Sequence, residues 1–280
     1  MKEINFTKMV ASGNDFVVIS ATRYLPDRQA GTLHAPRLKK LAQNICDRKY
    51  GVGADGLLVL EKSRIADARM RVFNADGSEA EMCGNGARCV ALWACVERRA
   101  KSAKLKIETK AGIIESQVNC DNVKIKLTDP KNLKLNIPIK INNRTLHVNF
   151  INTGVPHTVV FVEGLKKIDV TGIGRQIRFH KKFAPAGTNA DFAQVLSNNS
   201  VSLRTYERGV EDETFACGTG SVAAALVMSY ELGVRGNRRI NVHTKSKEIL
   251  KVYFDQTGDK FRNVWLEGKA RIVYKGAYNV

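Results

Sequence analysis

Short stretches in which apolar and polar residues alternate recur along most of this chain. In the first half they lie at residues 4–9, 16–20, 57–60, 69–74, 105–109 and 123–127. Alternation with a period of two is typical of strands that bury one face, so these stretches predict β-strands. Residues 37–46 and 85–98 repeat their apolar positions with helical spacing and predict two helices. The first half is therefore expected to mix α and β structure.

The order of elements starts again in the second half. A polar stretch rich in Lys and Asn runs from Asp129 to Asn143 and is the best candidate for a domain boundary. After it, a helix is expected at 219–232 and strands are expected at 145–152, 158–162, 190–196, 202–207, 240–243, 249–254, 263–267 and 270–274. Two halves with a similar order of elements suggest an ancient duplication.

Composition places the chain among globular proteins. It has 280 residues, of which 44% are apolar and 26% charged, so one large domain or two ordinary ones can each bury a core. The N-terminus lacks the apolar region and cleavage site of a signal peptide. The longest apolar runs, 89–96 and 222–228, are too short to span a bilayer. We expect a cytoplasmic protein with no membrane partner.

The six cysteines are expected to be free thiols. They stand at positions 46, 83, 89, 95, 120 and 217, without a Cys-x-x-Cys pair and without a histidine at metal-ligand spacing. A reducing compartment keeps such thiols reduced. No metal site is expected.

A net charge of +18, from 45 Lys and Arg against 27 Asp and Glu, raises nucleic-acid binding as a hypothesis. The basic residues are scattered, however, and aromatic residues do not interleave with them as in single-strand binding surfaces. A basic solvated surface is the favoured interpretation, and a nucleic-acid-binding protein is kept as a remote alternative.

A short motif occurs twice, about half the chain apart. Cys83-Gly84-Asn85-Gly86 and Cys217-Gly218-Thr219-Gly220 each open an apolar, helix-like run. A helix N-terminus offers free N–H groups to an anion and lowers the pKa of a thiol placed there. A structural glycine turn at the start of each helix is the alternative, but it does not explain a cysteine in both. The repeat predicts two matched thiols that face one anion.

Two thiols on opposite sides of a carbon can invert its configuration. One thiolate removes a proton from one face, and the other thiol delivers a proton to the opposite face. The helix N-termini would stabilise the charge that flows into an adjacent carboxylate. Neither a lysine context for pyridoxal phosphate nor a dinucleotide fingerprint is found, so no cofactor is expected.

The chain resembles the diaminopimelate epimerase family. The resemblance rests on seven segments that occur in the family's order and span almost the whole chain: residues 12–16, 51–56, 73–79, 83–88, 187–190, 206–209 and 216–220. It implies cofactor-independent epimerisation of LL- to meso-2,6-diaminopimelate, a late step toward lysine and peptidoglycan, in a homodimeric enzyme. A proline racemase-like enzyme with the same paired-thiol chemistry is the alternative.

The resemblance also implies a fold. Two similar α/β domains, each a curved, mostly antiparallel sheet around a central helix, would close over the substrate in the cleft between them. The N-terminal domain would comprise residues 1–129 and 270–280, and the C-terminal domain residues 130–269. Cys83 would come from the first and Cys217 from the second, as proton donor and acceptor whose roles exchange with reaction direction.

Site residues carry over by motif. His157 and Glu207 would support catalysis, with His157 near the thiols. The substrate would be bound by Asn14, Asn74, Gly84, Asn85, Asn189, Glu207, Arg208, Gly218 and Thr219. The amides at 84–85 and 218–219 would hold the reacting carboxylate, and Arg208 would pair with the distal one.

Two positions depart from the pattern of some members. Val155 stands where they have a substrate-binding Asn, and Gly56 stands where they have Gln. Both departures concern the distal end of the substrate, and Asn152 is a candidate to compensate for the first. Neither affects the two thiols.

Overall fold

The computed structural model describes residues 3–21, 35–233 and 236–280. The chain divides into two compact units, which we call unit 1 (Met1–Ile125 with Gly268–Val280) and unit 2 (Lys126–Glu267). Both divisions fall slightly before those expected from the sequence. The first falls within the strand Asn122–Lys126, before the polar stretch that begins at Asp129.

Unit 1 is built around one mixed sheet. Adjacent strands pair in the order β18, β1, β2, β3, β4, β6, β7, β8, and β5 also pairs with β4. The pairs β2/β3 and β4/β6 are parallel and the others antiparallel. The strands are β1 (Glu3–Ala11), β2 (Asn14–Ser20), β3 (Gly56–Glu61), β4 (Ala68–Asn74), β5 (Glu79–Ala80), β6 (Ser102–Thr109), β7 (Gly112–Asn119), β8 (Asn122–Lys126) and β18 (Arg271–Asn279).

Unit 2 repeats this arrangement. Its strands pair in the order β9, β10, β11, β12, β13, β15, β16, β17, and β14 also pairs with β13. The parallel pairs, β11/β12 and β13/β15, fall at the same places as in unit 1. The strands are β9 (Lys131–Ile141), β10 (Arg144–Asn152), β11 (Pro156–Phe161), β12 (Asn189–Ser197), β13 (Ser200–Glu207), β14 (Asp212–Thr214), β15 (Gly236–His243), β16 (Ile249–Thr257) and β17 (Lys260–Lys269).

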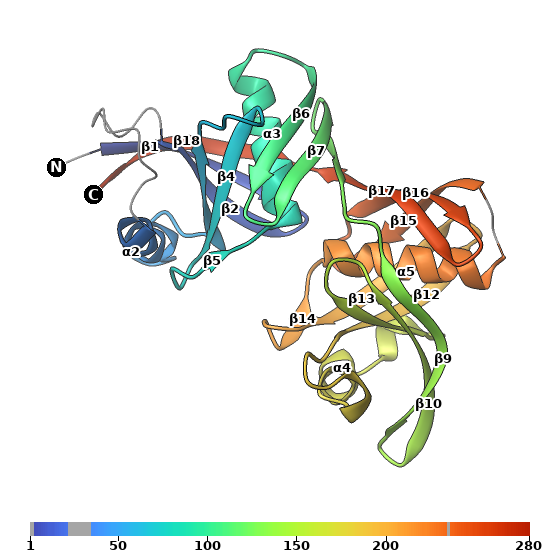
Figure 1. Cartoon of the computed structure of the whole chain (residues 1–280). Helices are drawn as coiled ribbons and strands as arrows, with labels where there is room; N and C mark the ends of the chain where they lie inside the picture. Colours follow the sequence, from blue (N-terminus) through green and yellow to red (C-terminus); the bar gives the residue numbers. More distant parts are fainter. Residues whose placement is uncertain (1–2, 22–34, 234–235) are drawn as a thin grey trace. The chain divides into compact units, whose positions relative to one another are not determined.

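The helices also occupy matching places (Figure 1). α2 (Ala35–Cys46) and α4 (Val170–Arg178) each lie in the connection of a parallel strand pair, where a crossover is required. α3 (Gly84–Glu97) and α5 (Gly218–Glu231) each follow the short strand β5 or β14. Two 3₁₀ turns, η1 (Leu165–Lys167) and η2 (Lys181–Phe183), complete unit 2. The matching order of strands, helices and pairings supports the duplication.

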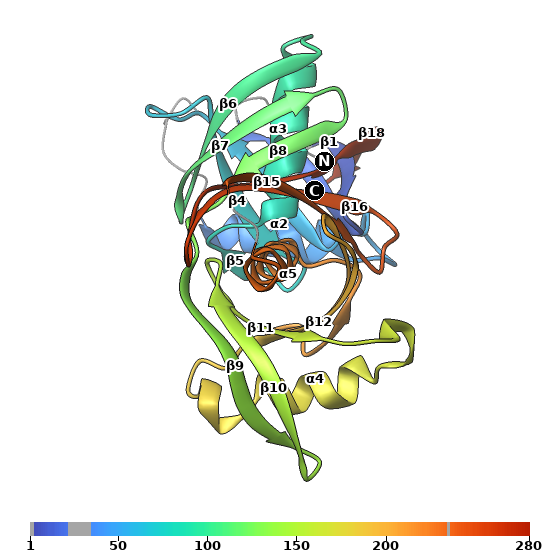
Figure 2. The ribbon, with the colours of Figure 1, turned by 90° about the vertical axis from the view of Figure 1, so that its right-hand side faces the viewer.

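α3 and α5 are the central helices of their units. The residues of α5 from Gly220 to Ser229 are buried without a gap, because its apolar residues continue around the helix instead of forming one stripe. Figure 2 shows α5 end-on with the strands of unit 2 around it. The mixed α/β class, with curved and mostly antiparallel sheets around central helices, is confirmed.

The Lys- and Asn-rich stretch after Asp129, which is the candidate domain boundary in the sequence, contains the long strand β9. Its Leu133, Leu135 and Ile137 alternate with polar residues and are less exposed than their neighbours, so the stretch has the period of a strand despite its polar composition. β7 and α4, which were not expected, are further elements of the structure.

Candidate active site

Both motif cysteines are N-cap residues of the central helices. Cys83 precedes α3 with φ −140° and ψ 118°, and Cys217 precedes α5 with φ −112° and ψ 116°. The Cys83 thiol accepts a hydrogen bond from Gly86 N at 3.4 Å. Cys83 is half-buried, and Cys217 is 6% exposed. The fold therefore places a thiol at the same point of each unit, beside the free N–H groups of a helix start.

The second glycine of each motif lies close against a side chain of its own unit. A Cβ at Gly86 would lie 3.0 Å from Leu58 Cδ2. A Cβ at Gly220 would lie 2.5 Å from Asp191 Oδ1, closer than any ordinary contact. Gly220 thus allows a buried carboxylate to approach the first turn of α5.

A directed chain of hydrogen bonds crosses the predicted substrate residues of unit 1. Arg88 Nη2 donates to Asn85 Oδ1 at 2.5 Å, and Asn85 Nδ2 donates to Asn14 Oδ1 at 2.5 Å. Asn14 Nδ2 in turn donates to Asp55 Oδ2 at 3.1 Å. A guanidinium only donates and a carboxylate only accepts, so the two ends fix the orientation of both amides between them.

A charged cluster holds the acceptor end of this chain. Arg48 bridges Asp15 and Asp55 with contacts of 2.8 and 2.7 Å, and Lys8 pairs with Asp15 at 2.7 Å. Lys8 also donates to the carbonyl of Gly53. Burial by itself would raise the pKa of Asp15, but its hydrogen bonds with Arg48 and Lys8 lower that pKa to about 2. Asp15 is therefore ionised at any physiological pH.

Strand register brings Asn74 to the same edge of the sheet. Gly56 pairs with Phe16 of β2 on one side and with Asn74 of β4 on the other. The Asn74 amide donates to Ser78 Oγ at 2.9 Å. A Cβ at position 56 would lie 2.7 Å from the carbonyl oxygen of Phe73, so the departure to glycine fits a close approach of the backbone.

In unit 2, a second line of hydrogen bonds leads to Cys217. Asp191 Oδ2 lies 2.6 Å from His157 Nδ1, and His157 Nε2 lies 2.9 Å from Thr219 Oγ1. Thr219 Oγ1 lies 3.5 Å from Cys217 Sγ. His157 and Asp191 are fully buried. The structure thus brings His157 into hydrogen-bond connection with one predicted catalytic thiol.

Other predicted residues surround this line. His157 of β11 pairs in register with Asn189 of β12, whose side-chain oxygen accepts from Arg208 N at 2.7 Å. The Arg208 side chain donates to Ala186 O at 3.1 Å. Glu207 ends β13, and burial raises its pKa.

The acidity of Cys217 differs from the sequence expectation. A helix N-terminus lowers the pKa of a thiol, but burial raises the pKa of Cys217 well above its ordinary value. The negative charges of Glu207 and Asp191 add to this increase. Burial and nearby carboxylates outweigh the helix, so the free thiol form is favoured.

Near Val155, the first of the two departures from the family pattern, Asn152 belongs to a tight turn. Its Oδ1 accepts from Gly154 N at 3.0 Å, and Thr153 N donates to Val155 O at 3.1 Å. The side-chain oxygen of Asn152 is therefore used locally. Compensation for Val155 by Asn152 stays a prediction.

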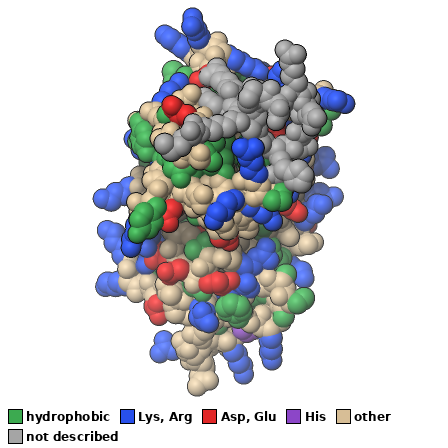
Figure 3. Space-filling view, turned by 90° about the vertical axis from the view of Figure 1, so that its left-hand side faces the viewer, with side chains coloured by type: hydrophobic (Ala, Val, Ile, Leu, Met, Phe, Trp, Pro, Cys, Tyr) green, Lys and Arg blue, Asp and Glu red, His purple; other side chains and the backbone are tan. Residues whose placement is uncertain are grey.

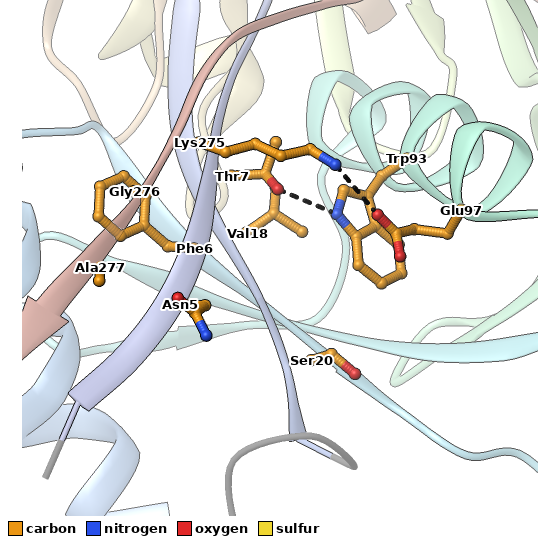
Figure 4. A pocket seen from close by; sticks show the side chains of 10 residues that line it. All are labelled: Asn5, Phe6, Thr7, Val18, Ser20, Trp93, Glu97, Lys275, Gly276 and Ala277. Carbon is orange, nitrogen blue, oxygen red and sulfur yellow. Dashed lines mark hydrogen bonds and ion pairs between the residues drawn. The ribbon is translucent and has the colours of Figure 1, made fainter.

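A separate cavity of about 500 Å³ in unit 1 contains none of the predicted site residues. It lies between β1, β2, β18 and α3 (Figure 4). In its wall Trp93 Nε1 donates to Thr7 Oγ1 at 3.2 Å, and Lys275 pairs with Glu97 at 3.3 Å.

Across residues 3–21, 35–233 and 236–280, none of the helices combines the length and apolar character that a membrane crossing requires. Within the same ranges, no group of three or more His, Cys, Asp or Glu side chains is arranged to hold a metal ion.

Three candidates for functional residues were not among those predicted from the sequence: Arg88, Asp55 and Asp191. Arg88 and Asp55 belong to the family-like segments, where only their neighbours were singled out. Asp191 stands two residues after Asn189 in the same strand, so the two side chains share a face. That spacing is the signal that could have found it.

Solved structures with the same fold define the class. A phenazine biosynthesis protein of the PhzF family from Bacillus anthracis matches with a TM-score of 0.75 and 20% identity, covering 100% of both chains. A probable proline racemase from Agrobacterium radiobacter matches with a TM-score of 0.70 and 15% identity, covering 99% of this chain and 92% of that one. At such identities the likeness shows the two-domain fold.

Sequence relatives define the family. The diaminopimelate epimerase of Aquifex aeolicus is 40% identical over 289 residues, covering 98% of this chain and 97% of that protein. The diaminopimelate epimerase of Hydrogenobaculum sp. is 41% identical over 275 residues, covering 96% of each. The model of the family described as diaminopimelate epimerase matches residues 6–133 and 149–273. The chain belongs to the diaminopimelate epimerase family.

Proposed function

We propose that this protein interconverts LL- and meso-2,6-diaminopimelate without a cofactor, with Cys83 and Cys217 as its acid/base pair. One thiolate removes the α-proton, and the other thiol delivers a proton to the opposite face. The observation that carries this proposal is the cysteine at the start of the central helix in two units of matching topology. Family membership supplies the substrate.

The helix starts suit the electrostatics of this reaction. Removing an α-proton sends negative charge into the neighbouring carboxylate. The free N–H groups at Gly84 and Asn85, and at Gly218 and Thr219, are donors suited to that carboxylate. We propose that these two pairs bind it, each unit contributing one pair.

The distal half of the substrate would be recognised by side chains. Arg208 would pair with the distal carboxylate. The distal amine and the stereocentre that stays L would be read by Asn14, Asn74, Asn189 and Glu207. The hydrogen-bonded chain through Asn85 and Asn14 supports this role, because it holds their amides in a single orientation. His157 and Glu207 would support catalysis from beside Cys217.

Deuterium exchange tests the proposal. LL-diaminopimelate incubated with the protein in deuterated water, without added cofactor, is expected to give meso product with deuterium at the inverted α-carbon. Cys83→Ala and Cys217→Ala should each abolish epimerisation, whereas Cys120→Ala, which removes an exposed cysteine on the β7–β8 turn, should not. Failure of the unaltered protein to form meso product, or near-normal turnover by either catalytic variant, would refute the proposal.

The same assay separates the alternative enzyme. Racemisation of proline without turnover of diaminopimelate would favour a proline racemase-like enzyme.

Nucleic-acid binding needs a separate binding measurement. The face in Figure 3 shows Lys and Arg side chains dispersed among acidic and uncharged ones. Salt-sensitive nucleic-acid binding that survives loss of both cysteines would support a nucleic-acid-binding role.

We further propose a homodimeric enzyme of the cytoplasm that supplies a precursor of lysine and peptidoglycan. Six free thiols suit a reducing compartment. β18 carries the exposed apolar side chains of Val273 and Tyr274, which a second copy could cover. Light scattering coupled to size-exclusion chromatography tests the dimer. A monomeric mass at micromolar concentration would contradict it.

A further inference from the structure

The hydrogen-bonded line behind Cys217 has a definite direction. Its polarity depends on which nitrogen of His157 carries the proton, and the neighbouring groups determine that. Asp191 Oδ2, 2.6 Å from Nδ1, is the carboxylate partner of one ring nitrogen. The other carboxylate oxygen, Oδ1, accepts from Thr205 Oγ1 at 2.7 Å, which holds Asp191 in place. A carboxylate favours a proton on the nitrogen that faces it, so Nδ1 is the N–H.

Asn189 supports the same assignment from the other side of the ring. Its Oδ1 accepts from Arg208 N at 2.7 Å, and its Nδ2 donates to Pro156 O at 3.1 Å, so its orientation is fixed at both ends. This Nδ2 lies 3.4 Å from His157 Nε2. An N–H group faces Nε2, so Nε2 carries the lone pair.

The hydroxyl of Thr219 then has one arrangement that satisfies both neighbours. It lies 2.9 Å from His157 Nε2, which accepts, so the hydroxyl donates there. Its oxygen lone pairs are left to face Cys217 Sγ at 3.5 Å, where the thiol S–H can donate. Thiol, hydroxyl and imidazole thus form one path for a proton.

We propose that Asp191 is a positioning residue that keeps the lone pair of His157 on Nε2, and that the Thr219 hydroxyl passes the Cys217 proton to His157. This inference rests on the proposed function and extends its machinery behind one thiol. The sulfur proton moves to Thr219 Oγ1, and the hydroxyl proton moves to His157 Nε2. The products are a thiolate, an intact hydroxyl and an imidazolium that donates to Asp191.

Cys217 needs such a path because it is buried among carboxylates. Asp191 on β12 and Glu207 on β13 both disfavour its thiolate, whereas His157 on β11 would become cationic as the thiolate forms. A nearby imidazolium stabilises both the thiolate and the Asp191 carboxylate. The same line can carry a proton back from His157 through Thr219 to the Cys217 thiolate, so it serves the reaction in both directions.

Three substitutions test the proposal. Asp191→Asn keeps the size of the side chain but removes the carboxylate that selects the tautomer. Thr219→Val keeps shape and backbone amide but removes the hydroxyl, and Thr219→Ser restores a hydroxyl. Ser200→Ala is the matched control, because it deletes a different hydroxyl that lies 2.8 Å from a histidine nitrogen, His243 Nε2, in the same unit.

Histidine tautomers are read by ¹⁵N NMR, which is tractable because the chain has only five histidines. We expect an Nδ1–H signal for His157 that Asp191→Asn abolishes or mixes with the other tautomer. In the epimerase assay, Asp191→Asn and Thr219→Val should lower kcat by about 10²–10⁴-fold with KM changed less than about threefold. Thr219→Ser should be at least about tenfold faster than Thr219→Val, and Ser200→Ala should match the unaltered protein.

Two outcomes overturn the proposal while the unaltered enzyme is active. One is an Asp191→Asn protein that keeps both the Nδ1–H signal and its rate. The other is a Thr219→Val protein as fast as Thr219→Ser, and this pair decides the matter if Asp191→Asn does not fold. Failure of the proposed function is distinguishable, because it appears as absence of epimerisation in the unaltered protein, where the tautomer can still be measured.

Discussion

Replacing the buried Arg88 by Met should destabilise unit 1 strongly. The Arg88 side chain is 0% exposed, and its Nη2 donates to Ser12 Oγ at 2.7 Å and to Asn85 Oδ1 at 2.5 Å. Hydrogen bonds to charged groups contribute about 1.5–3 kcal/mol each, and removing one partner leaves buried acceptors without a donor. We therefore expect the free energy of unfolding to fall by about 3–5 kcal/mol.

Arg98, at the C-terminal end of the same helix, provides the control. Its side chain is 47% exposed and pairs with Asp67 at 3.1 Å. An exposed pair of this kind contributes about 0–1 kcal/mol, so Arg98→Met should change stability little.

The two tryptophans allow unit 1 to be followed alone. Trp93 lies in unit 1 and Trp265 in unit 2, so a Trp265→Phe background leaves Trp93 fluorescence as the reporter. In this background, Arg88→Met should lower the urea midpoint by roughly 1–3 M. A midpoint no lower than that of Arg98→Met would show that the buried guanidinium does not stabilise the unit as we reason.

Three further predictions concern single positions. The pKa of Asp15 is about 2 against an ordinary 3.8, so its stabilising effect is complete above about pH 4 and is lost as pH falls toward 2. Asp15→Asn should therefore make the free energy of unfolding depend less on pH between about 4 and 2. An unchanged pH dependence would contradict this. Gly220→Ala would place a Cβ 2.5 Å from a carboxylate oxygen of Asp191, whereas the Cβ of Gly84→Ala would meet its first neighbour at 3.5 Å. Gly220→Ala should therefore lower Tm more than Gly84→Ala. Equal losses of Tm would refute the packing argument. Burial raises the pKa of Cys46 to about 12, so peptide mass spectrometry should find it alkylated at pH 8 far more slowly than the exposed cysteine on the β7–β8 turn, and equal rates would count against this.

The central helices could be predicted from the sequence because their signals are local. A cysteine and two glycines precede each apolar run, and the structure begins both helices at the first of these glycines. The amphipathic helix near residue 40 has an equally local signal. These elements need no knowledge of the partner strands.

α4 depends on tertiary contacts. Its sequence includes Gly172 and Gly174, which lower helix propensity. The helix is capped by Asp169, whose side chain accepts from Gly172 N at 2.9 Å. A Cβ at Gly174 would lie 2.5 Å from Tyr206 Cβ, so this glycine lets α4 pack closely on β13. Neither the space nor the partner strand is visible in the sequence.

The candidate site likewise has residues that the sequence predicts locally and residues whose role depends on the fold. The repeated motif indicates Cys83 and Cys217, since both positions follow from one local pattern. The role of Asp191 depends instead on strand register, which sets β12 beside β11 and brings the carboxylate to His157. A buried charge has no periodicity of its own, so it could be interpreted only after the fold was known.

The strand pairing of unit 1 has a consequence for how the protein is made. β1, the first strand of the chain, pairs with β18, the last, with Glu3 opposite Asn279. Unit 2, by contrast, is one continuous segment. At ribosomal rates of about 5–20 residues per second, β1 waits on the order of 10–60 s for its partner to be synthesised. Unit 2 can therefore complete its sheet first, and a nascent chain stalled before residue 271 would present an open edge of β1 to chaperones or to other chains.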